Sequence, residues 1–167
     1  MKIRTDFVTN SSSSSFVLQF NSEDSIEEEV KDSFPRRYSQ EIMELLLKDI
    51  GEAKRLTVEN VRNIAEQELY YETIWDMKEE YTDCYGRSKN PKMTQKEFYD
   101  WENSGAQDFK DEVDRRLKEK VEDITNALSN AGVIVEVEYE DHTDFGSCLE
   151  HEILPCFPNS VYRFSHH

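Results

Sequence analysis

Residues 133–167 decide the fold that we expect, and they read VIVEVEYEDHTDFGSCLEHEILPCFPNSVYRFSHH. The stretch opens in the period-2 pattern of a β-strand, in which successive side chains point to opposite faces. One face carries Val133, Val135, Val137 and Tyr139, and the other carries Glu136 and Glu138. Near the end of the stretch, residues 161–164 predict a last strand. The C-terminal part of the chain therefore supplies two strands of a sheet.

A further strand of this sheet comes from the other end of the chain. Residues 16–20 read FVLQF, a short apolar run. Between the ends, residues 22–132 read as helices, with capping boxes at residues 25–28 and 94–97, where Ser or Thr is followed three residues later by Glu. The longest periodic segment carries apolar residues at spacings of four and three: Phe109, Val113, Leu117, Val121, Ile124 and Leu128.

These elements predict an α+β protein of one domain. Residues 1–20 and 133–167 would form a sheet layer that also carries the site, and residues 22–132 would form a helical layer. A length of 167 residues suits a single domain with its own core. Because such a sheet joins both ends of the chain, the N-terminal serines and the C-terminal histidines would share one neighbourhood.

The charge balance argues against direct binding to nucleic acid. The net charge is -16 and the sequence pI is near 4.6, the opposite of the basic surface that binds a phosphate backbone. We expect a basic protein partner and no direct contact with nucleic acid. Three irregularly spaced cysteines indicate reduced thiols in the cytoplasm. No apolar run reaches membrane-spanning length and no secretory signal opens the chain, so we expect a cytoplasmic protein that does not contact a membrane.

A run of five serines near the N-terminus allows two interpretations. Serine runs are usually flexible linkers, and the chemistry alone favours a linker. The alternative is an ordered loop whose hydroxyl and N–H groups bind the oxygens of a small phosphate-bearing ligand. The ligand-binding residues of that loop would be Arg4, Asn10, Ser11, Ser12, Ser13, Ser14 and Ser15.

The two ends of the chain also carry a resemblance. Arg4, the FVTN of residues 7–10 and the SSSSSF of residues 11–16 resemble the opening of a loose set of uncharacterised bacterial and phage-borne proteins. The ending RFSHH, residues 163–167, resembles the end of some members. The resemblance covers roughly the first 16 and the last 25 residues. It implies that the two ends belong to one site and that the middle is variable, and it allows a phage or mobile-element origin.

All four histidines fall within the last 26 residues, which indicates a site near the C-terminus. A divalent metal takes three or four imidazole, thiolate or carboxylate ligands. Zinc, manganese or magnesium would be the metal, although the spacing matches no standard zinc motif. The candidate ligands are His142, His151, Asp144, His166 and His167.

Two other interpretations of this cluster stay open. In the first, the carboxylates and histidines form a structural hydrogen-bond network. In the second, the site is catalytic without a metal: Cys148 or Ser147 would be the nucleophile, with His151 and Glu150 as acid–base groups. We expect Cys156, between two prolines, to pack inside the protein.

Two functions from different classes follow. The first is a phage or mobile-element accessory protein that inhibits host defence: its acidic helices would bind a basic host protein that handles nucleic acid. The acidic segments are residues 27–29, 79–80 and 111–123, although basic residues lie among the last. The alternative is a metal-dependent hydrolase of a phosphoester or nucleotide, in which the C-terminal cluster activates a water.

Overall fold

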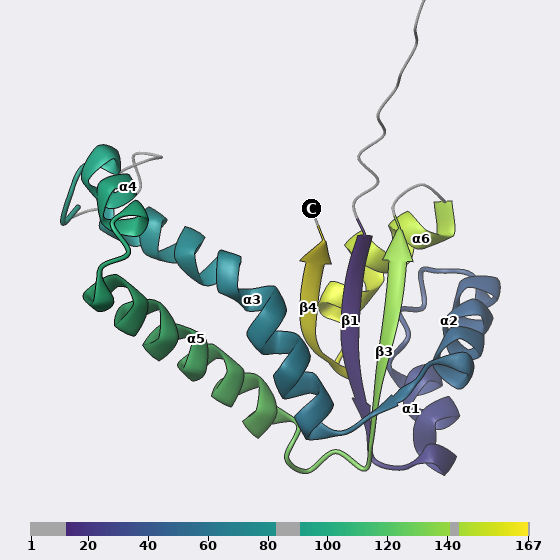
Figure 1. Ribbon diagram of the computed structural model, residues 1–167. Coiled ribbons are helices and arrows are strands. Elements are labelled where there is room, and N and C mark those ends of the chain that lie inside the picture. Colours follow the sequence, from purple (N-terminus) through teal and green to yellow (C-terminus); the bar gives the residue numbers. More distant parts are fainter. Residues whose placement is uncertain (1–12, 83–90, 141–143, 167) are drawn as a thin grey trace, which may run out of the picture. The chain divides into compact units, whose positions relative to one another are not determined.

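The computed structural model describes residues 13–82, 91–140 and 144–166. The chain forms two compact units (Figure 1). Met1–Thr57 and Asn130–His167 make the first, which we call the sheet unit, and Val58–Ser129 make the second, which we call the hairpin unit. The helices predicted over residues 22–132 are therefore divided between the two units. No helix among the described residues is long and apolar enough to span a membrane.

The sheet unit is built on an antiparallel sheet with the order β2-β3-β1-β4 (Figure 1). Its strands are β1 (Ser13–Phe20), β2 (Arg55–Leu56), β3 (Val133–Glu140) and β4 (Ser160–His166). The predicted α+β class and the three strands from the chain ends are confirmed. The short β2 was not predicted, because two residues are too few to show a periodic pattern.

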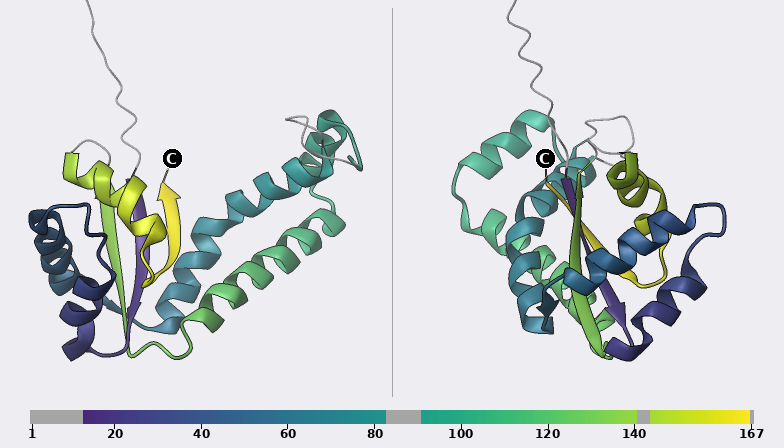
Figure 2. Two further views of the ribbon diagram at one scale, coloured as in Figure 1. Left: turned by 180° about the vertical axis from the view of Figure 1, so that it is seen from behind. Right: turned by 90° about the vertical axis from the view of Figure 1, so that its right-hand side faces the viewer.

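Helices cover one face of this sheet (Figure 2). They are η1 (Glu23–Ser25), α1 (Ile26–Ser33), α2 (Gln40–Glu52), α6 (Asp144–Cys148), the π-helical turn η2 (Leu149–Ile153) and η3 (Leu154–Cys156). Even-numbered side chains of β1 and odd-numbered side chains of β3 point into this core, as the period-2 pattern predicts. The central members are Phe16, Leu18, Val30, Leu46, Ile50, Val135, Leu149, Ile153 and Leu154.

Local contacts at the start of α1 differ from the sequence expectation. The predicted capping box at residues 25–28 is wrong, because Ser22 caps η1 in a box with Ser25, and the Ser25 side chain makes no capping hydrogen bond to α1. The Ser25 hydroxyl donates to Glu29 Oε1 at 2.6 Å.

Gly132, the residue before β3, lies against the backbone of Asn21. A Cβ added at this position would lie 1.8 Å from the Asn21 carbonyl oxygen. A glycine is therefore required where the chain enters β3.

The described residues of the hairpin unit form three helices: α3 (Val58–Tyr81), α4 (Gln95–Asn103) and α5 (Gln107–Ala127). The predicted capping box at residues 94–97 is confirmed, since Thr94 accepts from the Glu97 N–H and Glu97 accepts from the Thr94 N–H. Gly105, with φ of +68°, turns the chain from α4 into α5. An aromatic cluster fills the core at this end of the unit, formed by Tyr81, Phe98, Trp101 and Phe109.

Candidate functional site

Several of the predicted site residues lie outside the described part of the chain. These are Arg4, Asn10, Ser11, Ser12, His142 and His167. Ser13, Asp144 and His166 lie in the backbone of β1, α6 and β4. The metal prediction therefore stays a prediction, with only His151 among its ligands described in full. The remaining side chains are those of Ser14, Ser15, Cys148, Glu150 and His151.

The last three serines of the run belong to β1. Ser13, Ser14 and Ser15 pair with Glu140, Tyr139 and Glu138 of β3, and the Ser14 and Ser15 side chains are buried. The linker interpretation is wrong for these three positions. The reason is tertiary: β3 and β4 flank this segment on both sides and supply the hydrogen-bond partners that a serine-rich strand lacks on its own.

Ser14, Glu150 and Arg163 form a buried polar cluster at the joined ends of the chain. The Ser14 hydroxyl donates to Glu150 Oε1 at 2.7 Å. Arg163 donates from Nη2 to the same carboxylate oxygen at 3.0 Å, and from Nε and Nη2 to Ser14 Oγ at 3.0 and 2.8 Å. The Glu150 side chain is fully buried, and the Arg163 side chain is 33% exposed. The cluster thus joins β1, η2 and β4 through one charge-assisted network.

Local structure explains why Glu150 reaches this position. It lies in the π-helical turn η2, where Leu149, Glu150 and Ile153 are buried while His151 and Glu152 are exposed. Single π-helical turns redirect side chains and occur frequently at functional sites. The apolar neighbours anchor the turn against the sheet, so the carboxylate is carried into the core.

One oxygen of the buried carboxylate stays without a hydrogen bond. Glu150 Oε2 accepts none from the described residues, and His151 Nε2 lies 3.8 Å away. A protonated His151 would place a positive charge beside this oxygen. The His151 side chain is 46% exposed, so it connects the buried carboxylate with the surface.

The cluster fits the structural-network interpretation better than the metal-free catalytic one. Ser14 and Glu150 are buried and hydrogen-bonded to each other, as in a structural network. Burial, followed by the charge of Glu152, raises the pKa of the Cys148 thiol, which disfavours the thiolate that a nucleophile needs. Among the described residues, no group of three His, Cys, Asp or Glu side chains could hold a metal. Cys156 is exposed, so the expectation that it packs inside is wrong.

Arg163 is the member of the cluster that the sequence argument missed. The sequence patterns place Arg163 in the last predicted strand and in the C-terminal resemblance, but they assign it no role. The sequence does contain a signal for a role of Arg163, because it is the only Lys or Arg after Lys120. A lone cation in an acidic segment is a natural partner for a buried carboxylate.

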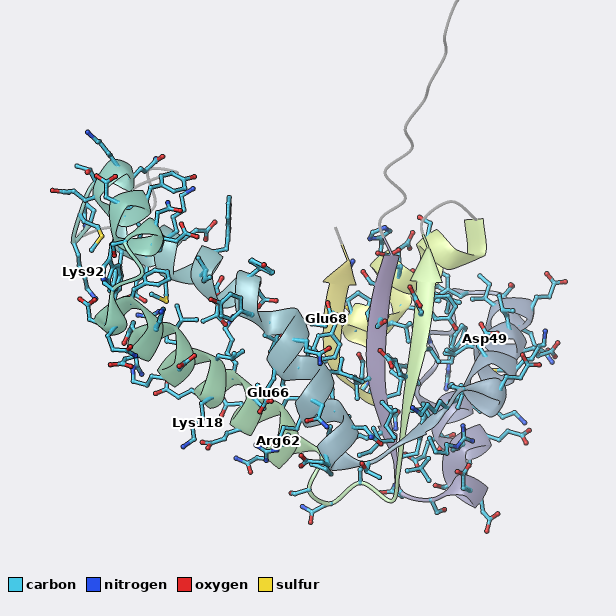
Figure 3. All side chains as sticks on the ribbon, viewed as in Figure 1. Asp49, Arg62, Glu66, Glu68, Lys92 and Lys118 are labelled. Carbon is cyan, nitrogen blue, oxygen red and sulfur yellow. The ribbon has the colours of Figure 1, made fainter. Side chains whose placement is uncertain are left out.

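A hydrogen bond on the same face of the sheet links β3 to α2. Tyr139, the neighbour of Ser14 across the sheet, donates from its hydroxyl to Asp49 Oδ2 at 2.9 Å. Asp49 lies on α2, where Figure 3 labels it. Burial and the charge of Asp49 raise the pKa of the Tyr139 phenol, so it stays a donor.

The hairpin unit supplies a second candidate surface, which is acidic. Residues 58–129 contain 18 Asp and Glu against 11 Lys and Arg, a formal charge of -7. Part of this charge is paired between helices: Arg116 contacts Glu80 at 2.7 Å, and Lys120 contacts Glu72 and Asp76 at 2.9 and 2.6 Å. On α5, hydrogen bonds from Arg115 and Arg116 lower the pKa of Glu112 to about 2.

Exposed aromatic side chains lie on this acidic unit. Tyr71 is 78% exposed, Trp75 47% and Tyr99 46%, and we call these three residues the aromatic patch. Tyr71 and Trp75 lie four residues apart on α3, hence on one face of the helix, and Tyr99 comes from α4. Large exposed aromatic side chains grouped on a surface are typical of protein-binding sites.

The lysine beside the patch connects its two helices. Lys78 on α3 donates from Nζ to the Tyr99 hydroxyl at 2.6 Å. Sequence reasoning found the acidic segment at residues 79–80 but missed the aromatic patch, because Tyr71 and Trp75 read equally well as core positions of a helix.

The chain was compared with protein families, curated proteins and solved structures, and no family model, no curated protein and no solved structure gives a significant match.

Proposed function

We propose that the protein is a cytoplasmic binding protein that recognises a basic protein partner through its hairpin unit. The observation that carries this proposal is the aromatic patch on α3 and α4, two helices that both carry an excess of acidic over basic side chains. Aromatic residues supply contact area, and the acidic surroundings steer and select a positively charged partner. The sheet unit, with its buried Ser14–Glu150–Arg163 cluster, serves as the scaffold.

The chain ends support a narrower class of partner. Their resemblance to phage-borne proteins favours a host protein that handles nucleic acid, because such proteins carry basic surfaces that bind phosphate backbones. An acidic, partly aromatic surface competes for the same basic groove. Inhibition of a host defence protein is the biological role that this binding mode supports.

The test is capture of a partner by the full-length protein from a bacterial lysate, with identification by mass spectrometry. Tyr71→Ala combined with Trp75→Ala should abolish capture. The matched control is Asn63→Ala with Gln67→Ala, which changes two exposed neutral side chains on the same helix and should leave capture unchanged. Charge reversal by Glu66→Lys and Glu68→Lys should weaken capture, since both acidic side chains lie on α3 (Figure 3).

Binding measurements with the purified partner test whether the aromatic patch is the binding surface. The purified partner should bind the wild-type protein through a basic surface and should lose affinity for the patch variant by at least tenfold. His151→Ala should leave binding unchanged, because His151 lies in the sheet unit. A partner that binds the patch variant as tightly as the wild type, or that presents an acidic surface, would refute the proposal.

A further inference from the structure

Lys78 already places a cation on the aromatic patch. Its Nζ lies 4.4 Å from the ring centroid of Tyr99 and 5.1 Å from that of Trp75. Both distances are within the range of cation–π attraction, in which the negative face of an aromatic ring attracts a positive charge. The indole of Trp75 is itself oriented, because its Nε1 donates to Glu79 Oε1 at 3.1 Å. The patch is thus arranged to hold a cation, and the chain supplies one from its own α3.

The helix that carries the patch is strongly negative. α3 contains seven Asp and Glu against two Lys and Arg, a formal charge of -5. Tyr71, Trp75 and Lys78 follow one another at helical spacings of four and three, so they share one face of α3. A positively charged side chain that approaches these rings enters a negative potential.

We infer that the aromatic patch is an arginine-binding site and that Lys78 occupies it in the absence of a partner. The occupant is an arginine side chain of the basic partner, so the inference rests on the proposed function. A guanidinium is planar, weakly hydrated and stacks well on Trp and Tyr, whereas an ammonium is a compact and strongly hydrated charge. An incoming arginine therefore displaces Lys78 from the rings, and the lysine ammonium moves into the solvent.

The experiment measures the affinity of the full-length protein for an arginine-rich peptide and for a lysine-rich peptide of the same length and charge. The arginine peptide should bind more tightly. Lys78→Met removes the internal competitor but keeps the aliphatic stem. It should raise the affinity for the arginine peptide by about two- to fivefold, the range expected for one exposed cation–π contact.

Lys118→Met is the matched control. Lys118 lies on α5 of the same unit with its side chain 75% exposed, and Figure 3 shows it extending away from the helix. Both variants remove one positive charge, so a gain from the change in net charge alone appears in both. Displacement from the rings makes Lys78→Met the stronger binder of the arginine peptide.

Trp75 provides an independent readout. The chain has two tryptophans, and Trp101 is packed in the aromatic cluster while Trp75 is exposed. In a 15N–1H spectrum the arginine peptide should shift the Trp75 indole signal, which Trp75→Phe identifies, and leave that of Trp101 unchanged. Trp75→Leu should lower the affinity by about two- to fivefold, with thermal unfolding as the check that this exposed substitution preserves the fold.

The outcomes separate two kinds of failure. If neither basic peptide binds the wild-type protein, the proposed function and the inference fall together. If basic peptides bind but Lys78→Met and Lys118→Met have equal affinities, or arginine and lysine peptides bind alike, the inference is refuted while the proposed function survives. Binding that shifts no Trp75 signal likewise refutes the arginine site alone.

Discussion

The Glu150 carboxylate depends on one cation. It is fully buried, and Arg163 donates to its Oε1 at 3.0 Å. Arg163→Met should destabilise the protein by about 3 kcal/mol, because it leaves a buried charge without its partner. The double substitution Glu150→Met with Arg163→Met should cost less than Arg163→Met alone, since no charge is then buried. Chemical denaturation of the single and double variants gives the coupling energy. Equal stabilities of the wild type and Arg163→Met would show that the ion pair contributes nothing.

At the scale of one element, the entry into β3 requires a glycine. A Cβ at position 132 would lie 1.8 Å from the Asn21 carbonyl oxygen, whereas a Cβ at Gly51 on α2 would have no heavy atom within 4 Å. We expect Gly132→Ala to lower the free energy of unfolding by about 1–3 kcal/mol, as overpacking does. Gly51→Ala should raise it by about 0.5–1 kcal/mol, because alanine favours the helix. Urea unfolding curves of the wild type and the two variants measure these opposite changes in the free energy of unfolding.

Glu112 makes the stability of the α5 helix depend on pH. Hydrogen bonds from Arg115 and Arg116 lower the pKa of Glu112 from 4.5 to about 2 in the folded state. A group with a lowered folded pKa binds more protons when unfolded, so its contribution is present above about pH 4.5 and is lost as the pH falls toward 2. Glu112→Gln should therefore reduce the loss of hairpin helicity between these values, as followed by circular dichroism. An unchanged acid transition in the variant would contradict this assignment.

For the whole molecule, the net charge of -16 determines how binding responds to salt. The association rate with a basic partner should fall steeply as the salt concentration rises from about 0.05 to 0.5 M, because the Debye length shortens from roughly 14 Å to roughly 4 Å. The dissociation rate should change less, since it reflects the aromatic contacts. Surface plasmon resonance at four salt concentrations measures both rates. An association rate independent of salt would argue against electrostatic steering.

Much of the fold could be predicted because its signals are local. Three patterns involve only residues that are close together in the sequence. They are the alternation over residues 133–139, the capping box at Thr94 and the apolar spacing from Phe109 to Leu128. The misplaced box at Ser25 has a simple cause: Ser22, Ser25, Glu28 and Glu29 form overlapping patterns, and only the folded contact with Glu29 decides between them.

Periodicity and composition predict the α+β class, the terminal strands, the long helices and the acidic balance, because these signals act over short distances. The sequence patterns also point to Ser14 and Glu150 as site residues. The tertiary structure brings these two residues together, 136 positions apart, and pairs Arg163 with both. It alone decided that Tyr71 and Trp75 are exposed. Contacts across such separations, and the outward face of a helix, depend on which surfaces pack together when the chain folds.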